Sequence, residues 1–378
     1  MKSNFEFLNR YWPALAQIGA AAESYVYSDA NACLYKLGMF GERLILEIFA
    51  FEHIKEPTID NTHANRIRLL KREGLIPKKI DDILYALRKT RNDAVHAGAD
   101  SVEDAKTLLS MTYNLAVWFM EVYGDWGYIA PAFVMPENVV QPDYESIIKE
   151  QEEKIVALSK QVDAVSTAAS SKTSKERAEK GETASESMDL SEAETRYLID
   201  EQFRKFGWEA DTNNLRYSRG TRPQKGRNLA IAEWPTDSTV GKNGYADYAL
   251  FVGLKLVGIV EAKKAAIDIP SVIDHQCKEY AKGIKAEHKD YVIGQWGAYK
   301  VPFVFATNGR KYLKQIETKS GIWCLDLRSG ANAPKALQGW ISPQGLMEQL
   351  EKDIAAANAA LQNTPFDLVQ NKHSTRSV

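Results

Sequence analysis

The chain has little cysteine. Only Cys33, Cys277 and Cys324 occur among its 378 residues, and no two of them form a C-x-x-C pair. This scarcity excludes a disulfide framework and a cysteine-rich zinc site, and it is typical of proteins of the reducing cytoplasm, where we expect this one. The N-terminus lacks the long apolar segment of a secretory signal peptide. No apolar run approaches the length that crosses a bilayer, so the sequence predicts no membrane-spanning segment.

Neither positive nor negative charge predominates in the sequence. The formal net charge is −2 at pH 7, so any surface for nucleic acid must be a local cluster. A nucleotide-binding P-loop is absent as well. The nearest approach, Gly241-Lys242-Asn243, has Asn243 where the motif needs Ser or Thr, and Thr236 stands where the motif needs glycine. We therefore expect no ATP to bind this chain.

A length of 378 residues predicts two or three domains. Residues 1–138 predict an all-α helical bundle, because apolar residues recur at helical spacing, glycines separate the segments, and no alternating strand pattern is present. The expected helical segments are Tyr11–Ala22, Leu34–Phe51, Ala64–Arg72, Ile80–Arg88 and Val102–Tyr123.

Residues 139–189 predict a connection between domains. Within them, Tyr144–Val165 keeps apolar residues three or four apart, which indicates a short amphipathic helix or a coiled coil. Residues 166–189 are rich in Ser, Thr, Ala, Lys and Glu and contain almost no large apolar side chain. Such a composition cannot bury enough apolar surface to fold alone, so we expect a flexible linker there.

Residues 190–330 predict an α/β domain, built as a mixed sheet with flanking helices. The expected elements are a helix at Glu192–Phe206, strands at Asn228–Trp234, Tyr245–Val252 and Leu256–Val260, a helix from Pro270 to about Ala286, and strands at Val301–Thr307 and Gly321–Leu327. Residues 331–378 predict one more helix, Ser342–Gln362, followed by a polar tail.

Three charged side chains mark the end of the predicted hairpin. Asp247 lies on its first strand, and Glu261 and Lys263 end its second strand, two residues apart and therefore on one face. If the hairpin pairs these strands, two carboxylates and an ammonium group meet at one sheet edge. Carboxylate oxygens suit Mg²⁺, which takes one or two protein carboxylates and completes its shell with water and phosphate. Ordinary surface charge at a strand end is the alternative.

Together with Gln276 and Tyr280, four residues apart on the next helix, these residues resemble the PD-(D/E)XK nuclease motifs. The Q-x-x-x-Y extension resembles that of type I restriction endonuclease R subunits and RecB-like nucleases. The segments NLAIAEWPT, GYADYALF and GIVEAKK resemble the nuclease domain of the R subunit, and KSNFEFL and MFGERL resemble its N-terminal portion.

The resemblance implies a PD-(D/E)XK fold in residues 190–330 and Mg²⁺ held by Asp247 and Glu261. It implies that Lys263 orients the nucleophile or stabilises developing charge, and that Gln276 and Tyr280 position DNA or support the site. It also implies Glu194 as a further acid at the metal. The alternative for Glu194 is a capping-box acid at a helix N-terminus.

Positive charge gathers between Asn213 and Asn228, with no acid among the basic residues. The cluster consists of Arg216, Arg219, Arg222, Lys225 and Arg227, with Tyr217 interleaved. Backbone phosphates of DNA are the natural partner of such a patch, and a solvated basic loop is the alternative. Lys264 and Arg310, which lie next to the predicted active edge, are further candidates for DNA contact.

A second constellation lies in the helical region. Arg91, Asn92 and His96 resemble the Arg-x4-His motif of HEPN-type helical domains, some of which cleave RNA without a metal. A histidine near neutral pKa can serve acid–base chemistry, and an arginine can hold a phosphate. The alternative is a helix end that is capped before Gly98. We interpret residues 1–138 as an HEPN-like docking domain.

The leading hypothesis is the endonuclease part of a type I restriction R subunit, a site-specific deoxyribonuclease that hydrolyses double-stranded DNA with Mg²⁺ in defence against foreign DNA. The resemblance implies modification (methyltransferase) and specificity subunits as partners. Full R subunits continue into an ATP-driven motor, which we expect this chain to lack. Two alternatives stay open: a non-catalytic module that docks on the modification subunit or on DNA, and an HEPN-type ribonuclease.

Overall fold

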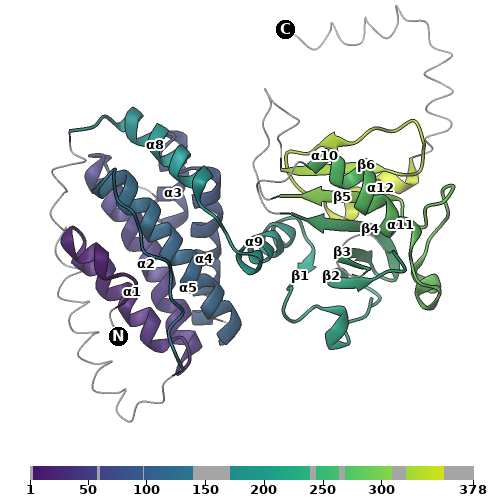
Figure 1. The fold of residues 1–378 in the computed structure, drawn as a ribbon, viewed down its shortest axis with the longest axis horizontal. Coiled ribbons are helices and arrows are strands. Elements are labelled where there is room, and N and C mark those ends of the chain that lie inside the picture. Colours follow the sequence, from purple (N-terminus) through teal and green to yellow (C-terminus); the bar gives the residue numbers. More distant parts are fainter. Residues whose placement is uncertain are drawn as a thin grey trace, which may run out of the picture. The chain divides into compact units, whose positions relative to one another are not determined.

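The computed structural model describes residues 3–57, 60–96, 98–138, 171–238, 244–263, 269–308 and 321–352. The chain forms two compact units, and the boundary between them lies between Leu198 and Ile199 (Figure 1). The predicted fold class is confirmed: a helical region precedes a mixed sheet with flanking helices. The predicted coiled coil at 144–165 lies outside the described residues. Within the described part of the chain, no helix has the length and apolar character needed to cross a membrane.

The first unit is a bundle of helices around one apolar core. Helix α2 packs against α1, α4 and α5, and the core includes the fully buried rings of Phe5, Phe40 and Phe119. Side chains of Asp29, Thr62 and Ser101 accept backbone N–H groups at helix starts. The helical elements are η1 (Glu6–Arg10), α1 (Pro13–Tyr25), α2 (Ala30–Phe51), α3 (His63–Arg72), α4 (Lys78–His96), α5 (Val102–Phe119), the π-helix η2 (Met120–Gly124), α8 (Ser174–Ser187) and the start of α9 (Glu192–Lys205).

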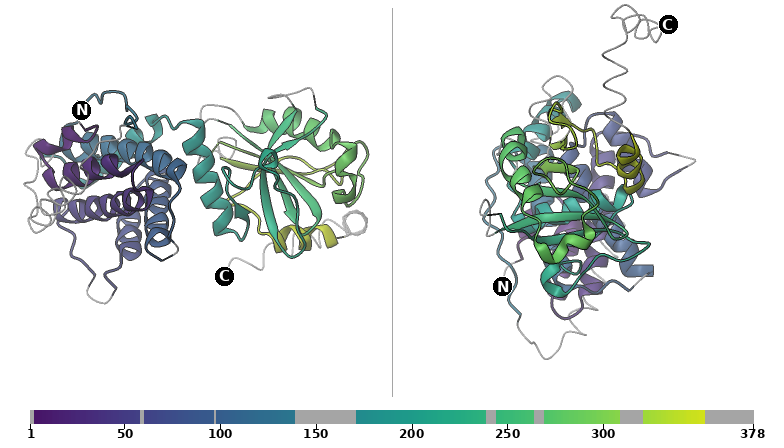
Figure 2. Two further views of the ribbon diagram at one scale, coloured as in Figure 1. Left: turned by 90° about the horizontal axis from the view of Figure 1, so that it is seen from below. Right: turned by 90° about the vertical axis from the view of Figure 1, so that its right-hand side faces the viewer.

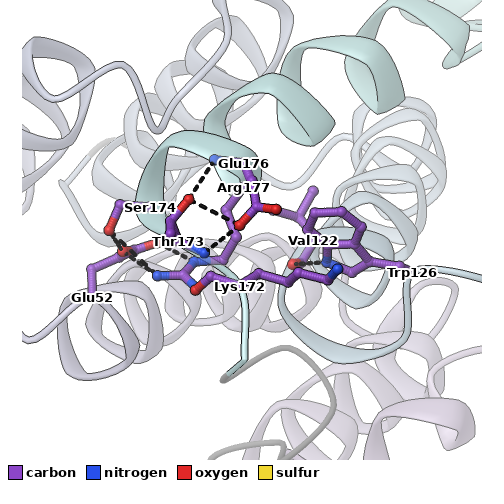
Figure 3. A network of polar contacts seen from close by, with 8 residues as sticks. All are labelled: Glu52, Val122, Trp126, Lys172, Thr173, Ser174, Glu176 and Arg177. Atoms are coloured by element: carbon purple, nitrogen blue, oxygen red, sulfur yellow. Dashed lines mark hydrogen bonds and ion pairs between the residues drawn. The ribbon is translucent and has the colours of Figure 1, made fainter.

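Helix α8 replaces most of the linker predicted for residues 166–189 (Figure 3). A capping box begins it, in which Thr173 Oγ1 accepts the Glu176 N–H and the Glu176 carboxylate accepts the Thr173 N–H. Arg177 donates from Nε to Glu52 Oε1 and from Nη2 to Glu52 Oε2, both at 2.7 Å. The linker prediction was wrong here because it counted only large apolar side chains, whereas small residues such as Ala184 pack into the core and the ion pair of Arg177 holds the start of this helix.

Seven strands form the sheet of the second unit. The strand order follows the sequence from β1 to β7. Pairs β1–β2 and β4–β5 are parallel and the remaining neighbours are antiparallel, so the sheet is mixed. The five predicted strands are present with ends that differ by at most two residues. The strands are β1 (Glu209–Ala210), β2 (Asn228–Pro235), β3 (Tyr245–Val252), β4 (Lys255–Ala262), β5 (Phe303–Thr307), β6 (Ile322–Asp326) and β7 (Lys335–Ala336).

Helices cover both faces of this sheet (Figure 2). One face packs against α10 (Ile269–Val272), the π-helix η4 (Ile273–Cys277) and α11 (Lys278–Lys282). The other face packs against α9 and α12 (Pro343–Glu351). The short 3-10 helices η3 (Tyr217–Arg219) and η5 (Ala286–Tyr291) lie in connections. Each strand of the hairpin is therefore buried on both sides, which explains its nearly continuous apolar sequence.

The second unit extends beyond residue 330, where the sequence predicted its end. Trp340 is buried and lies 4.3 Å from the Phe203 ring, centroid to centroid. Helix α12 begins after Ser342, as predicted, and its cap is the Ser342 hydroxyl, which accepts the Gly345 N–H. The described part of this helix ends at Glu351, and residues 353–362 of the predicted helix lie outside the described residues.

Asp200 is fully buried between α9 and the sheet, and burial raises its pKa from 3.8 to about 6. Its Oδ2 accepts the Thr212 N–H at 2.7 Å. Between pH 4 and pH 6 the folded chain keeps a proton that the unfolded chain has lost. The contribution of Asp200 to the free energy of unfolding is therefore fully present below pH 4 and falls as the pH rises through about 6. Asp200→Asn keeps the acceptor oxygen, and we expect it to reduce this pH-dependent fall in the free energy of unfolding by on the order of 2 kcal/mol.

Urea unfolding of the wild type and Asp200→Asn at several pH values measures this effect. Asp274→Asn is the matched control, because the Asp274 side chain is half exposed, at 50%. An unchanged pH dependence in Asp200→Asn would show that Asp200 is charged in the folded chain at pH 5.

Candidate functional site

The hairpin β3–β4 brings Asp247 and Glu261 together. Its register pairs Tyr248 with Val260, and the same register extended by one residue places Asp247 opposite Glu261. The Ala262 N–H donates a hydrogen bond of 2.7 Å to Asp247 Oδ2, which fixes this carboxylate against β4. Lys263 Nζ lies 2.5 Å from Glu261 Oε1. The structure therefore brings two carboxylates and one lysine together at a strand end, as the sequence predicts.

Burial and charge make Glu261 an unusual carboxyl group. Its residue is 5% exposed, and burial, followed by the negative charge of Asp247, raises its pKa to about 7. The ammonium group of Lys263 opposes this rise. Glu261 Oε2 is buried and receives no hydrogen bond from any described residue. A buried carboxylate oxygen without a partner is costly, and such groups are candidates for binding a cation or a substrate group.

A backbone hydrogen bond also fixes the position of Lys263. Its N–H donates a hydrogen bond of 2.7 Å to the Thr307 carbonyl, which continues the parallel pairing of β4 with β5. The Lys263 side chain is 21% exposed, so its ammonium group can reach both the buried Glu261 and a substrate in solvent.

These residues fit a hard divalent cation such as Mg²⁺. The described part of the chain contains no cluster of three or more His, Cys, Asp or Glu side chains suited to a metal. Mg²⁺ does not need one, since one or two carboxylates suffice when water and phosphate complete its octahedron. Asp247 and the unpartnered oxygen of Glu261 supply those two carboxylates, and the Ala262 carbonyl lies between Glu261 and Lys263 in the sequence.

The helix that carries Gln276 and Tyr280 lies against this face. Tyr280 is buried, and its pKa is raised first by burial and then by the negative charges of Glu261 and Asp247, which places its hydroxyl near both carboxylates. Gln276 is half-buried in the π-helix η4. The prediction of one continuous α-helix to about Ala286 was wrong, because η4 interrupts it and α11 ends at Lys282. π-Helical turns often mark functional sites, and this one contains Gln276 and directly precedes the α-helical turn that carries Tyr280.

Glu194 lies in the helical unit. Its Oε2 accepts the Ser191 N–H at 2.7 Å, and its Oε1 accepts a hydrogen bond of 3.2 Å from Asn114 Nδ2. Both carboxylate oxygens are thus used in a capping box and a helix–helix contact. The structure supports the capping alternative, and a metal role for Glu194 stays a prediction.

The basic cluster at 213–228 is partly neutralised. Arg227 pairs with Glu209 at 2.6 Å, and Arg216 pairs with Glu233 at 3.3 Å. The sequence could not show these pairs, because both acids lie outside the loop.

The remaining basic side chains of the cluster are open to solvent. Arg222 lies over the Tyr217 ring at 3.7 Å, Arg219 donates to Asn214 Oδ1, and Lys225 is exposed. Lys264 and Arg310 lie outside the described residues.

Arg91 and His96 are not brought together within one copy of the chain. Arg91 forms an ion pair with Glu42 and lies over the Tyr35 ring at 5.2 Å. His96 is exposed at the end of α4. Five residues of an α-helix turn the chain by roughly 140° beyond one full revolution, so the two side chains leave the helix on different sides.

One residue at this edge was missed by the sequence reasoning. Glu233 has φ +52° inside strand β2, a left-handed conformation that is rare for a residue other than glycine. It lies between Ala232 and Trp234, whose partners on β3 are Tyr248 and Ala246, so Glu233 is opposite Asp247. A single acid inside the apolar segment NLAIAEWP was the available signal.

Comparisons with known proteins show which proteins the chain resembles. A family model described as the second domain of the type I restriction enzyme EcoKI endonuclease subunit matches residues 209–350, and a domain of unknown function, DUF4145, matches residues 20–162. The EcoKI endonuclease subunit of Escherichia coli (strain K12) is 32% identical over 439 aligned residues, which cover 96% of this chain and 37% of that protein. No solved structure matches the chain. The chain spans little more than a third of this curated relative, and it is a homologue of the type I restriction endonuclease subunit.

Proposed function

We propose that residues 199–352 form a Mg²⁺-dependent endonuclease domain that hydrolyses phosphodiester bonds of double-stranded DNA. The observation that carries this proposal is the buried, unpartnered Glu261 Oε2 beside Asp247 and Lys263. It is supported by the match of residues 209–350 to a domain of a restriction endonuclease subunit. The relative is a subunit of a larger enzyme, so we propose that this chain works in a complex with modification and specificity subunits.

Each residue has a distinct role in the proposed reaction. Asp247 and Glu261 would hold Mg²⁺, with the Ala262 carbonyl as a further oxygen ligand. When bound, the ion would polarise the scissile phosphate and lower the pKa of a water molecule. Lys263 would donate hydrogen bonds to a phosphate oxygen and so stabilise negative charge that develops there. The hydrogen bond from the Ala262 N–H to Asp247 keeps this carboxylate in place without reorganisation.

Chelation of the metal tests the proposal. We expect the chain, assembled with its modification and specificity subunits, to nick supercoiled plasmid in Mg²⁺ and to stop in EDTA, with activity restored by excess Mg²⁺. Without the cation, no group polarises the scissile phosphate or lowers the pKa of the attacking water, so the loss of cleavage in EDTA should be complete. Nicking that continues in EDTA would contradict the proposal. Stable assembly without nicking would favour the non-catalytic docking module, and RNA cleavage in EDTA that His96→Ala removes would favour the HEPN-type ribonuclease.

A further inference from the structure

The segment that leads into the basic loop is attached to strand β2 residue by residue. The Ala232 N–H donates a hydrogen bond of 2.9 Å to the Leu215 carbonyl. Arg216 forms a parallel bridge with Ala232, and its side chain pairs with Glu233. This attachment places Arg216 beside the strand position that faces Asp247.

The aromatic contacts of the next residue continue the attachment. The Tyr217 ring lies 5.1 Å from the Trp234 ring in an edge-on arrangement, and the Tyr217 hydroxyl lies 3.1 Å from His288 Nε2. Trp234 is fully buried and His288 is 4% exposed, so Tyr217 is anchored in the core of the unit. Arg222 lies on this anchored ring. The attached segment is therefore held against strand β2 by backbone and aromatic contacts together.

The ion pair between Arg216 and Glu233 is weak enough for another anion to replace the carboxylate. Its atoms lie 3.3 Å apart, longer than the usual charge-assisted hydrogen bond of about 2.7–2.9 Å, and its side chains are 30% and 34% exposed. Arg227 and Glu209, by contrast, lie 2.6 Å apart, with three hydrogen bonds between the same two side chains. Exposed ion pairs are weak, and a phosphate offers the guanidinium the same paired acceptor oxygens as a carboxylate.

We propose that Glu233 holds Arg216 in the place of a DNA phosphate, and that Arg216 transfers from Glu233 to the sugar–phosphate backbone when a duplex binds at the catalytic edge. Glu233 is then a positioning residue, which acts through Arg216. Its left-handed backbone, opposite Asp247, is the kind of local strain that persists where function requires a particular side-chain direction. This inference rests on the proposed function in taking DNA as the ligand.

The affinity for a short DNA duplex tests the exchange without any cleavage. In the wild type, Arg216 must leave its ion pair with Glu233 before it binds a phosphate. In Glu233→Gln the guanidinium has no such ion pair to leave. We expect Glu233→Gln to bind a short duplex more tightly than the wild type in EDTA at one fixed salt concentration, by roughly two- to five-fold, which is the range that an exposed ion pair contributes.

A double-mutant cycle separates exchange from a general charge effect. The gain in affinity should vanish when Glu233→Gln is combined with Arg216→Gln, because no guanidinium remains to transfer. Glu348→Gln is the control, since it removes the same charge from an exposed residue whose carboxylate accepts a hydrogen bond from Gln344, and it should keep the wild-type affinity. Glu233→Asn repeats the test with a residue that tolerates a left-handed backbone, in case the glutamine variant does not fold.

Three results would overturn the proposal: equal affinities of Glu233→Gln and wild type for the duplex, an equal gain in affinity with and without Arg216, or the absence of DNA binding in both proteins. The outcome is separate from that of the nuclease proposal. Coupling between Glu233 and Arg216 without nicking would leave the exchange standing, and nicking without coupling would remove the exchange and leave the nuclease standing.

Discussion

Replacing Lys263 by alanine is expected to reduce Mg²⁺-dependent DNA cleavage by roughly 10²–10³-fold, while duplex binding stays nearly unchanged. Two losses combine. The ammonium group no longer stabilises charge that develops on the phosphate. Its removal also takes away the group that holds the pKa of Glu261 down, so that this buried carboxyl keeps its proton to a higher pH. A protonated carboxyl is a poor metal ligand.

The measurement is the rate of plasmid nicking beside a gel-shift assay of binding. Lys255→Ala is the matched control, because Lys255 is exposed at the start of the same strand. Its rate should equal that of the wild type. If Lys263→Ala cleaves as fast as Lys255→Ala, the lysine has no part in the chemistry. If it loses binding as well, Lys263 is a DNA contact and no more.

The second large effect concerns the stability of the helical unit. Arg177→Met is expected to destabilise it by about 3–5 kcal/mol, because Glu52, whose side chain is only 1% exposed, keeps its hydrogen bond from Ser174 but loses its charged partner. The guanidinium holds the pKa of this carboxyl below its usual value against the effect of burial. Helix α8 should loosen first, since Arg177 is its main buried contact with α2. Urea unfolding and hydrogen exchange of residues 174–187 measure both changes.

Two variants control for general effects of the substitution. Arg72→Met breaks an exposed pair with side chains 73% and 52% accessible, so its cost should stay under about 0.5 kcal/mol. Glu52→Met combined with Arg177→Met replaces the pair by two apolar side chains and should recover most of the loss. A cost for Arg177→Met as small as that for Arg72→Met would mean that α8 is held by other contacts.

The hairpin and its charged residues were predictable because their information is local. An apolar run, a glycine turn and a second apolar run fix the pairing of β3 with β4. The pairing then brings Asp247 and Glu261 together. The positions of the helices of the first unit followed in the same way from apolar spacing and from the glycines that separate the segments.

The features that were missed depend on contacts between distant residues. Helix α8 has few apolar residues, and its main partner, Glu52, lies 125 positions earlier in the chain. The ion pairs of Arg216 and Arg227 depend on where the basic loop meets the sheet. The left-handed backbone of Glu233 and the π-helix η4 are local in space, but no residue type at these positions demands them.

The claim that Asp247 and Glu261 form one metal site can be measured without cleavage. Titration of the chain with Mn²⁺, with the free ion followed by electron paramagnetic resonance, counts the ions bound by the wild type, Asp247→Asn, Glu261→Gln and the control Asp274→Asn. The account predicts a site that both active-edge variants lose and the control keeps. An unchanged number of bound ions in Asp247→Asn and Glu261→Gln would contradict it.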